Sequence, residues 1–539
     1  MKKNAFLTLI MVLVTFLFSS CTKDLNVEPI DPLINTSNNV FQTQGNYLRA
    51  LAKVYASYAI SGQQGAGGGQ PDIQGIDENF GNYLRQYFDL QELPTDEAIM
   101  AWDDATIKDF HWQTWSPNDV FITAEYSRIF YTISIANEFI RQANKGLSSA
   151  SGTFATNLKA YIAEARYLRA LSYWHAIDMF GNVPFVTEAE EPGAFFPQRI
   201  TRAKLFDYIE SELKAIEGDL IAPRQEYGRA DKGADWFLLA ELYMNAEVYT
   251  GTERYTDALT YLNKVISAGY SIDPNYAHLF TSDNNTSPEI IFPIVFDGVN
   301  TQQYGGMNFI IHASLGGNMP LSGVDGGWGG IRTIKDFVAK FNLSESDFSS
   351  ANPAPQSADH RGMFFFDPAS WQWDITNVGT FTQGIGVTKY KNLTSTGGKD
   401  PDWEAGFAST DFPMFRLGDA YLLYAEAVVR GGNGGDMATA VGYVNALRER
   451  AYGNTSGDIS SSQLTLDFLL EERARELYWE CHRRTDLIRF GKFTNDAGYL
   501  WQWKGNSFNG ATVPSYRDLY PIPVNDLNAN PNLVQNPGY

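Results

Sequence analysis

Amphipathic helices that follow one another in pairs constrain the fold of this chain more than any other feature. Residues 232–249 and 255–268 are two helical stretches joined by a short polar turn. Residues 419–430 and 437–451 repeat the arrangement around a glycine-rich connector. Small residues such as Ala240, placed where two helices touch, are typical of tetratricopeptide units of about 34 residues. The pattern predicts a mainly α-helical scaffold built from tetratricopeptide-like helix pairs.

Further helices are expected from apolar residues that recur at helical spacing. They lie at 41–60, 122–143, 158–180, 202–216 and 466–490. The last stretch mixes Glu and Arg three and four residues apart, which predicts ion pairs along a solvated helix face.

Between about residues 275 and 415 the helical periodicity disappears. Glycine, tryptophan and asparagine become frequent there, and 290–296 reads as a strand. A glycine-rich break lies at 61–71, and the irregular region is expected to include about 61–120 as well. The sequence therefore predicts a helical scaffold that carries a large irregular, loop-rich region with short strands. Loops on a rigid scaffold are where binding sites usually lie.

The N-terminus has the features of a bacterial lipoprotein signal. A basic start precedes an apolar run at 5–18, which is too short to span a bilayer, and two serines precede Cys21. We expect residues 1–20 to be a signal peptide, Cys21 to be lipidated, 21–40 to be a flexible tether and 41–539 to be a single domain. The alternative is an ordinary signal peptide followed by a coincidental cysteine.

The net charge argues against two classes of binding partner, and the cysteine content argues against an internal disulfide. The chain has 41 Lys and Arg against 62 Asp and Glu, a net charge of −21. Such a charge argues against binding to nucleic acid and against electrostatic attachment to anionic lipid. Cys481 is the one cysteine besides Cys21. No internal disulfide can form once Cys21 is acylated, so we expect Cys481 to be a buried free thiol in a helix.

The sequence gives little sign of catalysis. The six histidines show no metal-ligand spacing, and no nucleophile elbow is present. A glycosidase carboxylate pair stays possible because acidic residues are abundant. We expect no enzymatic activity and no cofactor, and leave metal binding open.

Aromatic residues in glycine-flanked loops are the best candidates for a binding site. Trp328 has two glycines on each side, and Tyr304 precedes two glycines. Aromatic rings pair well with the apolar C–H faces of sugars, while neighbouring polar groups can bind the hydroxyls. Packing in the core is the alternative role for both residues.

Five motifs in order along the chain resemble those of the SusD/RagB family of outer-membrane nutrient-binding lipoproteins. They lie at 164–184, 228–232, 415–427, 472–487 and 520–539. The resemblance implies a helical fold with four tetratricopeptide-like pairs and an irregular sugar-binding region. It also implies a lipid anchor at the cell surface and a partner, a TonB-dependent outer-membrane transporter of the SusC type.

Segments at 92–97, 297–306 and 327–328 resemble the starch-binding founder of that family. The resemblance implies a ligand arc of three aromatic residues and two polar ones: Trp102, Tyr304, Trp328, Asp77 and Arg85. One departure is Ala105, which takes the place of an asparagine in the founder's site. The expected function is capture of starch or maltooligosaccharides for the transporter. The alternatives are the same role for another glycan such as a β-glucan, or a protein-interaction scaffold.

Overall fold

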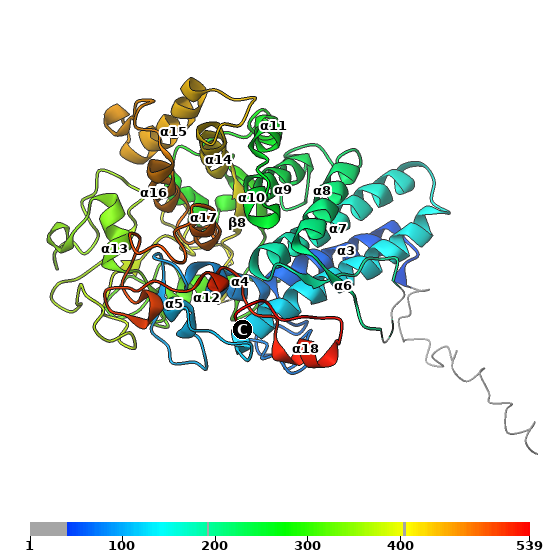
Figure 1. The fold of residues 1–539 in the computed structure, drawn as a ribbon, viewed down its shortest axis with the longest axis horizontal. Coiled ribbons are helices and arrows are strands. Elements are labelled where there is room, and N and C mark those ends of the chain that lie inside the picture. The colour runs from blue at the N-terminus through cyan, green and yellow to red at the C-terminus, as the bar shows by residue number, and fades with distance from the viewer. Residues whose placement is uncertain (1–39, 191–192, 194, 403–405) are drawn as a thin grey trace, which may run out of the picture.

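A computed structural model describes residues 40–190, 193, 195–402 and 406–539. Long helices form most of the scaffold (Figure 1). They are α3 (Gln44–Ala59), α6 (Val120–Leu147), α7 (Gly152–Met179), α8 (Arg202–Ile216), α9 (Lys232–Met244), α11 (Tyr255–Ile266), α14 (Leu417–Val429) and α15 (Met437–Tyr452). The predicted signal peptide, the lipidation site Cys21 and almost all of the tether lie outside the described residues.

Shorter helices connect this scaffold with the rest of the chain. They are α4 (Tyr83–Glu92), α5 (Asp109–Trp112), α10 (Ala246–Thr250), α12 (Gly306–Ala313), α13 (Lys335–Val338), α16 (Leu466–Leu477), α17 (Arg483–Arg489) and α18 (Val524–Ala529).

Several long helices begin at a side chain that accepts hydrogen bonds from the free amides of the first turn. Asp119 accepts bonds from the amides of Phe121 and Ile122 at the start of α6. Thr201 caps α8 and Asp436 caps α15 in the same way. These local signals explain why α8 and α15 begin where the sequence pattern places them, whereas α6 and α7 extend beyond the stretches expected at 122–143 and 158–180.

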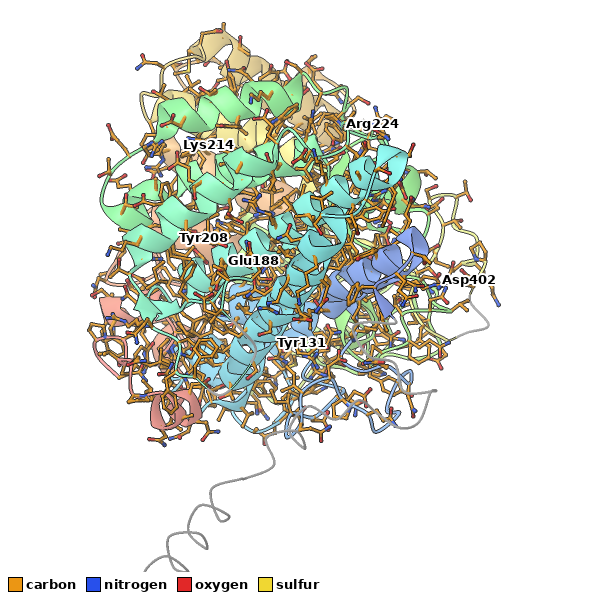
Figure 2. All side chains as sticks on the ribbon, turned by 90° about the vertical axis from the view of Figure 1, so that its right-hand side faces the viewer. Tyr131, Glu188, Tyr208, Lys214, Arg224 and Asp402 are labelled. Carbon is orange, nitrogen blue, oxygen red and sulfur yellow. The ribbon has the colours of Figure 1, made fainter. Side chains whose placement is uncertain are left out.

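The predicted helix pairs are confirmed by the packing. Helix α6 packs against α7 and α7 against α8, while α9, α11, α14 and α15 pack in series. Figure 1 shows this run from α6 and α7 at the right to α15 at the upper left. Figure 2 shows the face formed by α3, α6, α7 and α8, with Tyr131 on α6 and Lys214 on α8 labelled. The stretch predicted as one helix at 232–249 is divided into α9 and α10 at Asn245.

The prediction of one helix over 466–490 is wrong. The chain breaks between α16 and α17, where Trp479 and Cys481 have φ values of 63° and 67°. The amide of Trp479 donates to Glu97 Oε2 at 3.0 Å, and the amide of Cys481 donates to Glu92 Oε1 at 2.5 Å. Since these amides bond to carboxylates from a distant segment, they cannot continue a helical ladder. Cys481 is a buried free thiol, as expected, but it does not lie in a helix.

The charged face predicted on the same stretch is not a solvated row of local pairs. Glu472 and Glu476 of α16 are fully buried, and Arg361 Nη1 lies 2.9 Å from both. Arg416 Nη1 lies 2.7 Å from Glu476 on the other side. These arginines come from the irregular region and from the strand before α14. The charges of α16 therefore hold the irregular region onto the scaffold.

The irregular region predicted over about 275–415 is confirmed, and its strands are short. Four antiparallel pairs form: β1 (Ile99–Met100) with β5 (Ile331–Arg332), β2 (Val183–Pro184) with β3 (Arg199–Ile200), β4 (Ile290–Ile294) with β8 (Phe412–Arg416), and β6 (Phe364–Phe365) with β7 (Gly386–Val387). The strand predicted at 290–296 is β4. The β1–β5 pair joins two segments more than two hundred residues apart, and the candidate site lies beside it.

Candidate functional site

The three predicted aromatic residues lie together in the structure. The ring centroids of Trp102 and Trp328 are 6.4 Å apart, and those of Tyr304 and Trp328 are also 6.4 Å apart. Tyr304 is 44% exposed, while both tryptophans are half-buried. Trp102 follows β1 and Trp328 precedes β5, so the strand pairing brings the two rings to one place.

One main-chain and one side-chain hydrogen bond hold the segments of the two tryptophans together. The amide of Ala101 donates to the carbonyl of Gly330 at 2.8 Å, next to the β1–β5 pair. The Trp102 indole Nε1 then donates to the carbonyl of Trp328 at 3.0 Å. Since the indole N–H of Trp102 already has a hydrogen-bond partner, its apolar ring face is the part left for contact with a ligand.

Gly330 allows the close approach that this arrangement requires. A Cβ at Gly330 would lie 2.7 Å from Trp102 Cε2 and 3.2 Å from Met100 Sδ. On the other side of the cluster, a Cβ at Gly305 would lie 2.2 Å from Asn82 Cβ. Asn82 caps α4, so this contact brings the loop of Tyr304 against the start of α4.

The sequence pattern does not mark His312 as a site residue, although its ring packs against Trp328 of the aromatic cluster. Its ring stacks on Trp328 with centroids 4.6 Å apart and planes 17° apart. Nδ1 of His312 lies 2.6 Å from the carbonyl of Gly326 and donates to it. Burial lowers the pKa of His312, which favours the neutral ring. No local motif marks this residue, because the stacking depends on the fold of the loop after α12.

The predicted polar residues lie at the start of α4. Arg85 is 7% exposed, and its guanidinium lies 4.2 Å from the ring centroid of Phe309 and 5.8 Å from that of Trp102. Burial lowers the pKa of Arg85, and the charges of Asp89, Asp104 and Asp77 oppose this effect. The buried guanidinium therefore borders the aromatic cluster as a cation that stacks on rings.

Asp77 is exposed on the turn before α4. Its Oδ1 accepts hydrogen bonds from the amides of Asn79 and Phe80 at 2.8 and 3.2 Å. Arg85 Nη1 donates to the carbonyl of Asn79 at 3.5 Å. The turn thus places the Asp77 carboxylate close enough to Arg85 for its charge to act on the guanidinium.

Ala105 is exposed and has a φ of 41°, in the left-handed region that disfavours residues with a Cβ. It lies three residues after Trp102. Asparagine is among the residues best tolerated in this conformation. The backbone at this position therefore suits the asparagine that the resemblance places there better than it suits alanine.

The cluster can bind a ligand that has apolar faces and polar edges. Half-buried rings offer flat contact area at low cost in side-chain freedom, and the carboxylate of Asp77 and the guanidinium of Arg85 can form hydrogen bonds. A cavity of about 800 Å³ lies elsewhere, between α6 and α18, and is lined by residues such as Phe130, Phe196 and Leu533. None of the five predicted site residues lines that cavity.

Across the described part of the chain, we find no helix with both the length and the apolar character needed to cross a membrane. Residues 365–539 match the profile of the SusD family. The starch-binding protein SusD of Bacteroides thetaiotaomicron is 36% identical over an alignment 558 positions long, covering 97% of this chain and 96% of that protein.

Solved structures show the same fold at lower identity. A SusD superfamily protein from Parabacteroides distasonis has a TM-score of 0.70 at 21% identity, covering 92% of this chain and 100% of that one. Surface glycan-binding protein A from Bacteroides thetaiotaomicron, in complex with laminarihexaose, has a TM-score of 0.65 at 20% identity, with 92% and 100% covered. The chain belongs to the SusD/RagB family of glycan-binding proteins, which are not enzymes.

Proposed function

We propose that this protein captures starch and maltooligosaccharides at the cluster of Trp102, Tyr304 and Trp328, with Asp77 and Arg85 as polar contacts. The observation that carries the proposal is the convergence of the three rings, with centroid separations of 6.4 Å. The similarity to a starch-binding relative over 97% of the chain supports an α-glucan as the ligand.

The curvature of an α-glucan suits such an arc, because successive sugar rings turn their faces toward successive aromatic rings. Each stack should contribute about 1 kcal/mol, in line with aromatic contacts generally. Three stacks and a few hydrogen bonds give a dissociation constant of roughly 0.01–1 mM, or about −4 to −7 kcal/mol. A polymer that meets many copies on a cell surface is retained despite weak single sites.

The glycan would then pass to a TonB-dependent transporter of the SusC type. In this proposal, lipidated Cys21 anchors the protein to the outer membrane with the binding domain exposed at the cell surface. Isolation of the full-length lipoprotein in mild detergent should recover the transporter in the same complex, whereas the Cys21→Ser chain expressed without its signal should not recover it.

A β-glucan is the second candidate ligand. The relative solved in complex with laminarihexaose has the same fold and binds a β-linked glucan. The aromatic cluster here would then stack on a straighter chain. A direct comparison of α- and β-glucans therefore belongs in the first experiment.

Native gels that contain amylopectin, laminarin, dextran, inulin or xylan test the proposal. The protein without residues 1–21 should be retarded by amylopectin, and Trp102→Ala or Trp328→Ala should abolish the retardation. Phe196→Ala is a matched control, because this ring is 59% exposed and lies outside the cluster. Its retardation should equal that of the unmodified protein.

The other outcomes separate the alternatives. Retardation by laminarin instead of amylopectin would keep the family role and replace the ligand. Retardation that survives both tryptophan substitutions would place the glycan elsewhere on the molecule. No retardation in any gel, together with no binding of short oligosaccharides by calorimetry, would refute glycan capture by this cluster and favour the interaction scaffold.

A further inference from the structure

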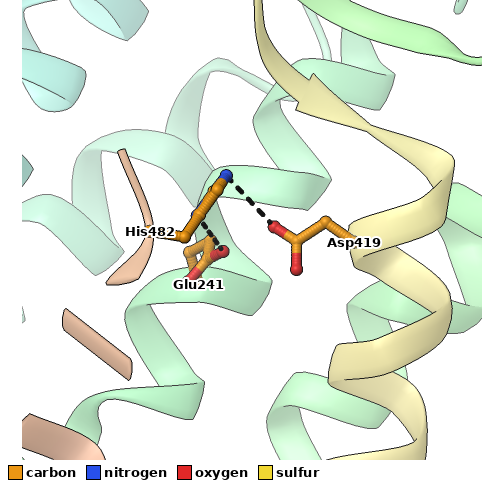
Figure 3. Close-up of side chains that lie close together, drawn as sticks. All are labelled: Glu241, Asp419 and His482. Carbon is orange, nitrogen blue, oxygen red and sulfur yellow. Dashed lines mark ion pairs between the residues drawn. The ribbon is translucent and has the colours of Figure 1, made fainter. Parts of the chain in front are cut away.

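Three buried side chains from separate parts of the helical scaffold meet away from the aromatic cluster. Glu241 belongs to α9, Asp419 to α14, and His482 immediately precedes α17. His482 Nε2 lies 3.6 Å from Asp419 Oδ2, and His482 Nδ1 lies 4.0 Å from Glu241 Oε1 (Figure 3). The residues are 2%, 0% and 8% exposed for Glu241, Asp419 and His482, respectively.

Each carboxylate has one oxygen bound by the protein and one without a partner. Asp419 Oδ1 accepts a hydrogen bond from Arg473 Nη1 at 2.6 Å, and Glu241 Oε2 accepts one from Asn245 Nδ2 at 3.4 Å. The other two oxygens, Asp419 Oδ2 and Glu241 Oε1, are buried, have no hydrogen-bond partner among the described residues and face His482. Buried carboxylate oxygens of this kind need a proton, a cation or a hydrogen-bond donor such as water.

The surrounding ion pairs leave the charge of Glu241 uncompensated. Three arginines and three carboxylates pair with one another around the cluster: Arg430, Arg473, Arg489, Asp419, Glu426 and Asp486. Their charges balance. Within the described residues, the one ion-pair neighbour of Glu241 inside 4.0 Å is His482. A buried charge without a partner is costly, so one further positive charge belongs at this point.

We propose that Glu241, Asp419 and His482 bind a divalent transition-metal ion such as Zn²⁺. One imidazole nitrogen and two carboxylate oxygens are donors that Zn²⁺ takes at about 2.0–2.2 Å in tetrahedral geometry, so two ligand atoms of one ion lie about 3.4 Å apart. The three ligand atoms lie within 4.8 Å of one another. The atoms of the most distant pair need to approach by up to about 1.4 Å to bind one ion.

The neighbours of the three side chains resemble the outer shell of a metal site. Arg473 and Asn245 orient the two carboxylates by holding their other oxygens, as partners of metal ligands usually do. The side chain of His482 is 10% exposed. A bound ion would join α9, α14 and the start of α17, and would stabilise the packing of the helix pairs.

A proton is the competing cation. Burial raises the pKa of Glu241, and the charge of Asp419 raises it further. Metal binding must displace this proton.

Calorimetry on the full-length protein in detergent, first treated with chelator, tests the proposal. Zn²⁺ should bind at one strong site and raise the midpoint of thermal unfolding. His482→Gln should weaken this site by about 100-fold or more, because it removes the nitrogen ligand. His360→Gln is the matched control, since His360 is exposed and distant in sequence, and it should leave the strong site unchanged.

Anomalous diffraction at the zinc absorption edge decides the matter even if His482→Gln fails to fold. A peak between Glu241, Asp419 and His482 in crystals of the unmodified protein supports the site. Peaks confined to exposed histidines, a strong site that persists in His482→Gln, or the absence of strong binding would each overturn the proposal. In these cases a proton neutralises the cluster.

Discussion

Gly330→Ala should disrupt the cluster of Trp102, Tyr304 and Trp328, the proposed glycan site, without removing any of its aromatic rings. The new Cβ would lie 2.7 and 2.8 Å from Trp102 Cε2 and Cζ2. Carbon atoms in good contact lie about 3.5–4.0 Å apart, so the indole must move by about 0.8 Å. Such a shift stretches the 3.0 Å bond from Trp102 Nε1 to the carbonyl of Trp328 beyond the limit of a hydrogen bond.

The expected losses of stability and of ligand binding in Gly330→Ala follow from these contacts. Overpacking costs about 1–3 kcal/mol, and the lost hydrogen bond costs about 1 kcal/mol more. The free energy of unfolding should therefore fall by about 2–4 kcal/mol, with the fold retained. Displacing Trp102 removes about 1 kcal/mol of stacking, which weakens maltooligosaccharide binding about fivefold.

Chemical denaturation followed by circular dichroism, and calorimetry with maltoheptaose, measure the two effects. Gly326→Ala is the matched control in the same loop, because a Cβ there has no atom within 4 Å. It should change neither quantity. The reasoning fails if Gly330→Ala binds and unfolds like the unmodified protein, or if Gly326→Ala shows the same losses.

Four further changes test other parts of the structure. Arg416→Met removes a buried cation 2.7 Å from Glu476 and should lower the free energy of unfolding by about 3–5 kcal/mol; a loss below 1 kcal/mol would contradict a buried network. Ala105→Asn should relieve left-handed strain and raise stability by up to about 1 kcal/mol, while tightening maltooligosaccharide binding; reduced stability would refute this. Burial raises the pKa of Asp89 to about 7, so its contribution is fully present below pH 4 or so and is lost as pH rises through about 7. Asp89→Asn should flatten the stability profile between these pH values, and an unchanged profile would count against it. Cys21→Ser should move the protein from the membrane fraction to the soluble fraction, and continued membrane attachment would exclude lipidation at this residue.

The helical scaffold was largely predictable because its signals are local. The helix expected at 202–216 coincides with α8, and that expected at 437–451 differs from α15 by one residue. In each case an apolar face with helical spacing follows a capping side chain, Thr201 or Asp436. Neighbouring residues alone supply this information.

The break after α16 was not predictable for the opposite reason. The residues at 478–482 continue a helical pattern, yet Glu92 and Glu97 take the amides that the helix would use. These carboxylates lie nearly four hundred residues away in the sequence. The burial of the charges on α16 has the same origin, because Arg361 and Arg416 reach it from distant segments.

The candidate site combines both kinds of information. A family resemblance marked Trp102, Tyr304 and Trp328, and the neighbouring glycines singled out Tyr304 and Trp328 as aromatic residues in loops. Neither indicated His312, whose stacking on Trp328 depends on the loop after α12.

The amino-acid pattern alone was enough to identify a helical scaffold with an irregular region and to single out glycine-flanked aromatic residues, because periodicity, caps and turns act over a few residues. Tertiary structure decided that β1 pairs with β5 and that Trp102 and Trp328 lie in one aromatic cluster. It also decided that Glu241, Asp419 and His482 meet in the core. These contacts form between segments that are far apart in the sequence. They depend on the burial of apolar surface between those segments and on the pairing of buried charges, and both require the folded chain.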